Sequence, residues 1–165
     1  MSKLMDLPEI DGAREIHCYW PASGSSEVDT RDLIAQLRTR NVRIYLPVVV
    51  SFERSSDSER ILEAEYGARP RLIPNRWGIL EPASDSARSF ACDVAIVPGF
   101  GASRSGIRVG YGWGYYDELL RDTAAPVIMP CFDACLLQDI TADPRDRPVS
   151  CIVTETSVVR TGGTM

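Results

Sequence analysis

The sequence has little of the two side chains that most often serve catalysis and phosphate binding. It contains one histidine, His17, and one lysine, Lys3, among 165 residues. A single histidine argues against a histidine-rich metal site and against a Ser–His or Cys–His catalytic pair, and His17 itself lies in a strand-like run. Because Lys3 stands near the start, no lysine in the body of the chain can contact a phosphate.

Other absences exclude whole classes of protein. The five cysteines include no CxxC pair and no disulfide-like framework, and Cys18, Cys92 and Cys151 lie in apolar runs that predict buried thiols. A formal charge of −5 argues against a nucleic-acid partner. The sequence has no signal peptide and no apolar run long enough to cross a membrane, so we expect a cytoplasmic protein without a membrane partner.

Apolar runs alternate with helix-like segments, a pattern typical of an α/β fold. We expect helices capped by Asp29 or Thr30 and beginning at Tyr115, and strands at 15–20, 43–50, 92–98, 126–132 and 150–155. Residues 59–66 fit either a helix or an exposed strand, and residues 75–82 resemble a loop. The alternation predicts one Rossmann-like, three-layer domain at 15–158, in which helices cover both faces of a mainly parallel sheet. A loose lead-in at 1–14 and a flexible tail at 159–165 are expected to flank it.

A glycine-rich loop at 110–114 holds the densest group of functional residue types. Its three alternating glycines permit positive φ and leave bare N–H groups that can bind phosphate. Arg108 adds a cation at the mouth of the loop, and Asp117 adds a carboxylate suited to a metal ion. In open parallel sheets ligands bind beyond the carboxyl ends of the strands, which is where this loop lies. A glycine-rich turn can also serve packing alone, and the spacing is not that of the dinucleotide fingerprint.

These motifs resemble the 5-formyltetrahydrofolate cyclo-ligase family, also called methenyltetrahydrofolate synthetase. The resemblance covers residues 15–158 and depends on an ordered series: EVDT at 27–30, IYLP at 44–47, WGILEP at 77–82, VPG at 97–99, RVGYGWGYYD at 108–117, and Asp146 followed by IVTE at 152–155. Several of these motifs are weak alone, whereas the order and the glycine-rich core are specific.

The resemblance implies the cyclo-ligase fold and an ATP- and Mg²⁺-dependent conversion of 5-formyltetrahydrofolate to 5,10-methenyltetrahydrofolate. ATP would phosphorylate the formyl oxygen, N10 would attack the activated carbon, and phosphate would leave. The implied catalytic residues are Arg108 and Tyr116. The nucleotide would lie on Arg108 and on the loop that follows, namely Gly110, Tyr111, Gly112, Trp113, Gly114 and Tyr115.

The resemblance also implies the folate and metal ligands. Glu27, Trp77 and Tyr116 would bind the reduced folate, Glu27 near the formyl group and the two aromatic rings as walls for the pteridine. Asp117 and Asp146 would bind Mg²⁺, which usually takes one or two carboxylates plus phosphate and water. Each residue has a structural alternative. Glu27 fits a first-turn acid and Trp77 a core residue under a loop, whereas Asp117 fits a helix cap and Asp146 a turn residue.

The chain departs from the family pattern at its start and in the glycine loop. Family members usually begin with a long amphipathic helix whose Lys and Arg reach the ATP phosphates. Here residues 1–14 contain no such helix, and Lys3 and Arg14 are out of register, so we expect that N-terminal helix to be missing. Trp113 fills a position that is generally glycine or lysine, and it is expected to crowd the phosphate path.

Three functions are compatible with these observations. The first is a working cyclo-ligase, whose partners are a reduced folate and a nucleotide. The second is a catalytically impaired family member that binds nucleotide or folate in a regulatory or interaction role, which Trp113 in the phosphate site would favour. The third is an ATP-dependent enzyme that acts on a different small carboxylate. In each case we expect a monomer or weak homo-oligomer.

Overall fold

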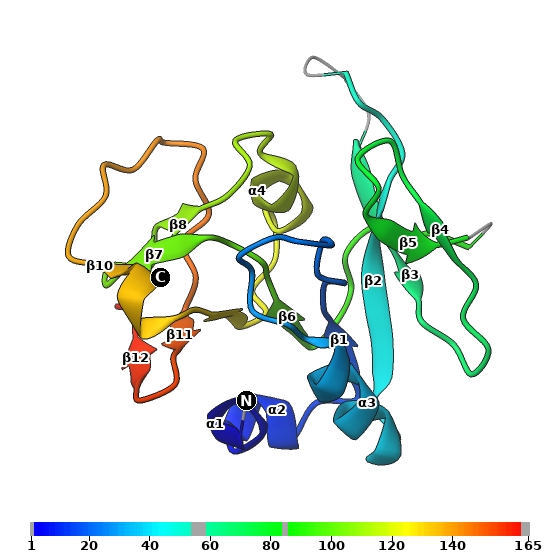
Figure 1. Cartoon of the computed structure of the whole chain (residues 1–165), viewed down its shortest axis with the longest axis horizontal. Coiled ribbons are helices and arrows are strands. Elements are labelled where there is room, and N and C mark those ends of the chain that lie inside the picture. The colour runs from blue at the N-terminus through cyan, green and yellow to red at the C-terminus, as the bar shows by residue number, and fades with distance from the viewer. Residues whose placement is uncertain (1, 54–58, 84–85, 163–165) are drawn as a thin grey trace.

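A computed structural model describes residues 2–53, 59–83 and 86–162, and Figure 1 shows a central sheet with helices on two sides. The sheet has seven strands in the order β12-β11-β9-β6-β1-β2-β3. Their bounds are β1 Glu15–His17, β2 Arg43–Val49, β3 Ile61–Glu65, β6 Val94–Ile96, β9 Val127–Pro130, β11 Cys151–Val153 and β12 Val158–Arg160. The five inner strands are parallel, and the edge strands β3 and β12 pair antiparallel to their neighbours.

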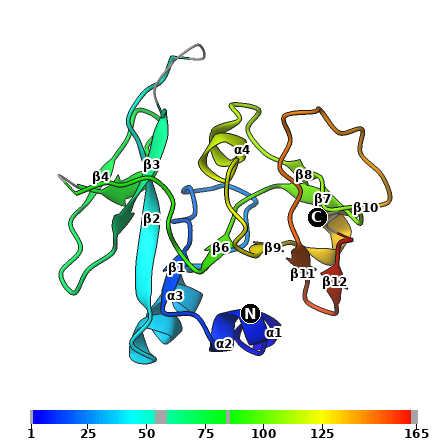
Figure 2. The same cartoon turned by 180° about the vertical axis from the view of Figure 1, so that it is seen from behind.

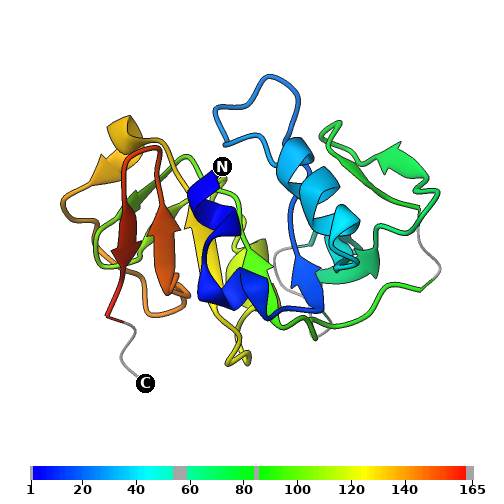
Figure 3. The same ribbon diagram turned by 90° about the horizontal axis from the view of Figure 1, so that it is seen from below.

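Alternation of side chains along the strands builds a separate core on each face of the sheet. In β6, Val94 and Ile96 belong to one cluster, whereas Ala95 and the following Val97 belong to the other. The first cluster includes residues of α1 (Ser2–Met5), α2 (Pro8–Asp11) and α3 (Arg31–Thr39), which cover one face (Figures 1 and 3). The second lies under α4 (Tyr115–Leu119). The predicted three-layer α/β fold is therefore confirmed.

The helix α3 forms where its apolar spacing predicts. Leu33, Ile34 and Leu37 lie on one side of the helix and are buried to 2% exposure or less. Thr30 occupies the N-cap position, but its hydroxyl donates to the carbonyl of Tyr19 at 2.6 Å. Asp29 accepts from the backbone N–H of Arg31 at 3.0 Å, so Thr30 holds the N-cap position while the side chain that binds a free helix N–H is that of Asp29.

Two small sheets stand beside the main one (Figure 2). One contains β7 (Gly101–Ser103), β8 (Arg108–Val109) and β10 (Leu136–Leu137), which follows the short 3₁₀ helix η1 (Asp133–Cys135). The other is a hairpin of β4 (Leu72–Pro74) and β5 (Leu80–Pro82), so the loop expected at 75–82 is wrong for its last three residues. The first of these sheets leads into the glycine loop, and the hairpin stands beside β2.

The lead-in expected to be loose is ordered and packed. Residues 2–5 and 8–11 are helical, and Leu4, Leu7 and Ile10 are each no more than 4% exposed. Pro8 suits the first turn of α2, because its fixed φ is helical and its missing N–H would be unpaired there anyway. The two helices are each one turn long, so no sustained periodicity marks them in the sequence.

We expect Leu4→Ala to lower the free energy of unfolding by about 2–3 kcal/mol, because it opens a cavity in the core that the end of the chain can only partly fill. Urea unfolding followed by circular dichroism measures the change. Asp6→Ala is the matched control, since Asp6 is exposed two residues away and should change stability by less than about 0.5 kcal/mol. Equal losses in both variants would contradict a packed N-terminus.

Three further expectations are settled by the structure. Residues 61–65 form strand β3 at a sheet edge, and Ile61, Glu63 and Ala64 are buried, so the segment is neither a helix nor an exposed strand. The tail expected at 159–165 is ordered at its start, where β12 pairs with β11; residues 163–165 lie outside the described residues. The predicted buried thiols are confirmed at Cys18, Cys92 and Cys151.

Among the described residues, no helix has the length and apolar character needed to cross a membrane.

Candidate active site

The site lies where the loops that follow β1 and β6 meet. The chain leaves β1 into a loop that carries Glu27, and it leaves β6 through β7 and β8 into the glycine loop and α4. In open parallel sheets this carboxyl edge is the usual place for ligands. The residues predicted for folate and nucleotide and the metal ligand Asp117 are on these two connections or on the neighbouring hairpin, whereas Asp146 lies between β10 and β11.

Arg108 and Asp117 form an ion pair at the base of the glycine loop. The Arg108 Nη2 donates to Asp117 Oδ1 at 2.8 Å, and the side chain of Arg108 is 9% exposed. The backbone N–H of Arg147 donates to the same oxygen at 3.1 Å. Asp117 therefore holds these two groups and makes no helix cap, while Arg108 Nε has no hydrogen-bond partner among the described residues. A nearly buried guanidinium with a spare donor can serve an anion at this point.

Tyr116 lies between Arg108 and the sheet. The Arg108 guanidinium carbon is 5.5 Å from the centre of the Tyr116 ring, and the His17 ring meets that ring edge-on at 5.8 Å. The Tyr116 hydroxyl is buried and has no partner within the described part of the chain. Burial raises the pKa of Tyr116 well above its ordinary value, and the nearby charge of Arg108 offsets only part of that rise. Tyr116 therefore remains a neutral phenol.

Glu27 lines a pocket of about 350 Å³ between its own loop and the β4–β5 hairpin. Its carboxylate accepts from the Ser25 hydroxyl at 3.0 Å and is half-buried. The remaining lining residues are Trp20, Pro21, Ala22, Ser23, Gly24, Ser25, Asp29, Arg31, Gly78 and Leu80. Glu27 is not a first-turn acid, because α3 begins at Arg31 and its first-turn acid is Asp32. Its partly buried carboxylate at a pocket wall suits a ligand contact.

The glycine loop leaves open space above its backbone. Gly112 and Gly114 have φ of 75° and 71°, in the left-handed region that side chains disfavour. A Cβ added at Gly112 would meet no atom within 4 Å. Tyr111 in this loop is 55% exposed. Trp113 in the same loop contacts Trp77, and the next residue, Gly78, lines the pocket that contains Glu27. The loop thus offers bare backbone next to the pocket.

Trp77 belongs to a ring cluster that joins the hairpin to the glycine loop. Its ring centre is 4.9 Å from Phe52, 5.5 Å from Trp113 and 5.9 Å from Tyr115. Trp77 is 39% exposed, so it is neither a core residue nor free of packing. The ring of Trp113 also stacks on Tyr115 with planes 17° apart. The Trp113 ring therefore packs against the hairpin.

Asp146 has the turn role that its sequence context offered as an alternative. Its Oδ2 accepts from the backbone N–H of Asp143 at 2.8 Å, and its own N–H donates to the Asp143 carbonyl at 2.9 Å. Across residues 2–53, 59–83 and 86–162, no group of three or more His, Cys, Asp or Glu side chains is placed to hold a metal ion. Magnesium binding by Asp117 and Asp146 stays a prediction.

Two residues beside the loop escaped the sequence-based prediction. Arg60, at the start of β3, donates from its Nε and its backbone N–H to the Glu118 carboxylate at 2.6 Å each. Its Nη2 donates to the Trp113 carbonyl at 3.3 Å, and its guanidinium carbon is 4.7 Å from the centre of the Tyr115 ring. The sequence offered one sign of this pair: Glu118 comes directly after the glycine motif. The pair fixes the loop and α4 to the edge of the sheet.

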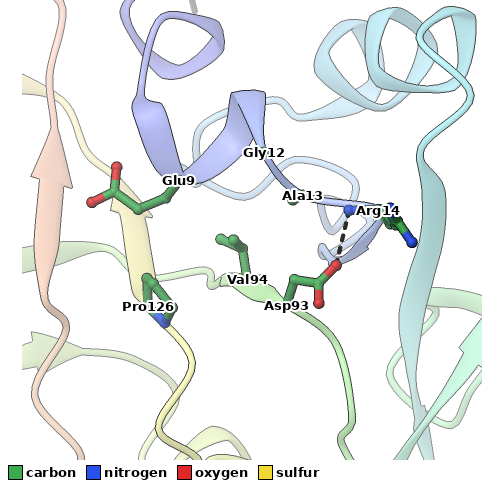
Figure 4. A pocket seen from close by; sticks show the side chains of 7 residues that line it. All are labelled: Glu9, Gly12, Ala13, Arg14, Asp93, Val94 and Pro126. Carbon is green, nitrogen blue, oxygen red and sulfur yellow. Dashed lines mark hydrogen bonds between the residues drawn. The ribbon is translucent and has the colours of Figure 1, made fainter.

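A second hollow, of about 390 Å³, lies at the opposite edge of the sheet (Figure 4). It is near the amino ends of β1, β6 and β9. Its acids are already bonded within the protein: Asp93 accepts from the N–H groups of Arg14 and Glu15 at 2.8 and 3.0 Å, and Glu9 pairs with Arg160. This hollow takes no part in the site above.

Comparisons with known proteins agree with the geometry. A model of the 5-formyltetrahydrofolate cyclo-ligase family matches residues 1–155. The Escherichia coli K12 5-formyltetrahydrofolate cyclo-ligase is 28% identical over 163 residues, which cover 95% of this chain and 86% of that protein. The Mycolicibacterium smegmatis 5-formyltetrahydrofolate cyclo-ligase is 32% identical over 148 residues, which cover 86% and 73%.

A solved structure shares the fold over nearly the whole chain. The NMR structure of Aquifex aeolicus 5,10-methenyltetrahydrofolate synthetase has a TM-score of 0.78 and 26% identity, and the match covers 99% of this chain and 80% of that one. The Mycoplasma pneumoniae synthetase, at 21% identity and a TM-score of 0.63 over 92% and 79%, has the same fold. Since the family model spans most of the sequence, the chain belongs to the 5-formyltetrahydrofolate cyclo-ligase family, a family of ligases.

Proposed function

We propose that the chain uses ATP to convert 5-formyltetrahydrofolate to 5,10-methenyltetrahydrofolate. The observation that carries the proposal is the Arg108–Tyr116 contact beside the open glycine loop, whose Trp113 touches the hairpin that borders the Glu27 pocket. Together they combine an acid at a pocket wall, a neutral phenol and a buried cation, as a folate bound next to a nucleotide requires. Family membership supplies the reaction class.

In the proposed reaction the formyl oxygen takes the γ-phosphoryl group of ATP, and ADP leaves. N10 then attacks the activated carbon and gives up its proton, and the C–O bond breaks with release of phosphate. The N–H groups of 110–114 and the guanidinium of Arg108 would offset phosphate charge as it moves, which lowers the barrier electrostatically. Glu27 would hold the folate near its formyl group, and Trp77 and Tyr116 would enclose the ring system.

A magnesium ion would supply charge neutralisation for the phosphates. Asp117 fits this task in chemistry, because its carboxylate is a hard oxygen donor at the base of the loop, 23% exposed. Its Oδ1 accepts from Arg108 and from the backbone N–H of Arg147, so a metal ion there would share the carboxylate with these two donors. Asp146 fits less well while its Oδ2 holds the 143–146 turn.

A Trp113 ring in the phosphate site would favour a catalytically impaired member. The ring packs on Trp77 and Tyr115, and this packing gives that alternative no support. Whether Trp113 also touches the nucleotide stays a prediction.

The first experiment follows methenyl product formation by absorbance, with and without ATP and Mg²⁺. We expect turnover only when both are present. A folded protein that gives no product under any of these conditions would overturn the proposed function.

Glu27→Gln should raise KM for 5-formyltetrahydrofolate by about tenfold, because a charge-assisted hydrogen bond to the folate is replaced by a neutral one. The KM for ATP should change little. Steady-state kinetics with each substrate varied in turn provide the measurement. Asp32→Asn is the control, since Asp32 is an exposed acid on the neighbouring helix. Equal rises in both KM values would assign Glu27 to the loop's own structure.

A further inference from the structure

A cluster of aromatic rings connects the two halves of the proposed site. Trp113 lies in the glycine loop between Gly112 and Gly114, and Trp77 lies at the tip of the β4–β5 hairpin. Their ring centres are 5.5 Å apart, and both rings also meet Tyr115. These are the loop proposed for the nucleotide and the hairpin that borders the folate pocket.

The Trp113–Trp77 contact adjoins both the pocket that contains Glu27 and the glycine loop proposed for the nucleotide. Gly78, the residue after Trp77, lines the pocket that contains Glu27. On the other side, the Trp113 carbonyl accepts from Arg60, and Tyr115 Oη donates to the Ser51 carbonyl at 3.0 Å. The contacts with Arg60 and Ser51 hold the cluster to the sheet.

We propose that Trp113 is a positioning residue that couples the two substrates: its contact with Trp77 makes binding of the nucleotide strengthen binding of the folate, and the reverse. This inference deepens the proposed function and rests on it. Trp113 stands between two glycines in the left-handed region, so no neighbouring side chains in the loop restrain the backbone on either side of its ring. Because the Trp113–Trp77 contact ties the glycine loop to the hairpin, a substrate that restrains one of them also restrains the other, and the second substrate loses less conformational entropy on binding.

The coupling is measured with a non-hydrolysable ATP analogue and 5-formyltetrahydrofolate by calorimetry. In the unmodified protein we expect the folate Kd to fall by at least about fivefold when the analogue is saturating, and the analogue Kd to fall by the same factor. Trp113→Leu should reduce that factor by about two- to tenfold, the contribution of one aromatic pair. Trp113→Phe keeps a ring and should restore most of the coupling.

Two further variants serve as controls for this measurement. Phe132→Leu removes an aromatic ring that is 40% exposed outside the cluster, and it should leave the coupling unchanged. Trp113→Met, which keeps apolar bulk without a ring, replaces the leucine variant if that variant is unfolded by circular dichroism.

The outcomes separate the inference from the proposed function. If both ligands bind and the coupling is absent, or equal in Trp113→Leu and the unmodified protein, this inference is overturned and the proposed function stands. If neither ligand binds the folded protein, both are overturned.

Discussion

Replacing Arg108 by alanine should lower kcat/KM for ATP by about 10²- to 10³-fold, the usual effect of removing one fixed charge or donor from a site where charge develops. Arg108 is 9% exposed, so its guanidinium acts where water screens little. Its Nε has no partner in the described chain and is available to an anion. Steady-state kinetics with ATP varied at saturating folate give the measurement.

The selectivity of the Arg108 effect is the decisive observation. Loss of the cation should weaken the folate much less than the nucleotide, because Glu27 and Trp77 are left in place. Arg104→Ala is the matched control: Arg104 is an exposed arginine on the turn between β7 and β8, and its loss should leave both constants unchanged. An equal loss for both substrates would show that Arg108 serves only to hold Tyr116 and Asp117.

The elements that build the sheet were predictable because their signals are local. The runs at 43–50, 92–98 and 126–132 become β2, β6 and β9, since continuous apolar stretches bounded by turn residues suit strands buried on both faces. The glycine loop was placed between a strand and a helix for the same reason. Short elements were missed: α1 and α2 have a single turn each, and β12 follows a tight turn from β11. One turn or three residues give no periodicity to detect.

The site was predictable only in part, because its geometry depends on contacts between distant residues. The family motif predicts Glu27 as a folate ligand, and in the structure Glu27 lines a pocket. Nothing in the sequence links Arg60 to Glu118, which are 58 residues apart, or His17 to Glu63, 46 apart. The orientation of the Trp113 ring also cannot be predicted from the sequence, since a ring between two glycines can turn to either side of the loop. Packing against the hairpin decides it.

The His17–Glu63 pair leads to the second large effect, which is on stability. Glu63 is fully buried on the edge strand β3, and an ionised carboxylate can only accept hydrogen bonds. It accepts from His17 Nδ1 at 3.1 Å, from Arg88 Nε at 3.0 Å and from the Ala91 N–H at 3.1 Å. The Cys92 thiol donates to it at 3.3 Å. These bonds join β3 to the inner strand β1 and to the segment before β6.

Glu63→Gln should lower the free energy of unfolding by about 3 kcal/mol, because removing one charge from a buried network leaves its partners unpaired. The loss is at the low end of the range for buried pairs, since Arg88 is 37% exposed and keeps Glu15 as a partner at 2.8 Å. Urea unfolding at neutral pH measures it. Glu65→Gln is the matched control on the same strand, where the side chain is exposed, and should cost less than about 0.5 kcal/mol.

The pH dependence distinguishes this network from a loss of packing. Burial alone would raise the pKa of Glu63, but the hydrogen bond and charge of His17, with the Ala91 N–H and the Cys92 thiol, outweigh it and lower that pKa below its ordinary 4.5. A lowered folded-state pKa contributes stability that is complete above 4.5 and is lost as pH falls through the folded value. The gap in unfolding free energy between the unmodified protein and Glu63→Gln should therefore narrow as pH falls below 4.5, because glutamine has no proton to take up. A gap that stays constant across that range would mean that the side chain contributes by shape alone.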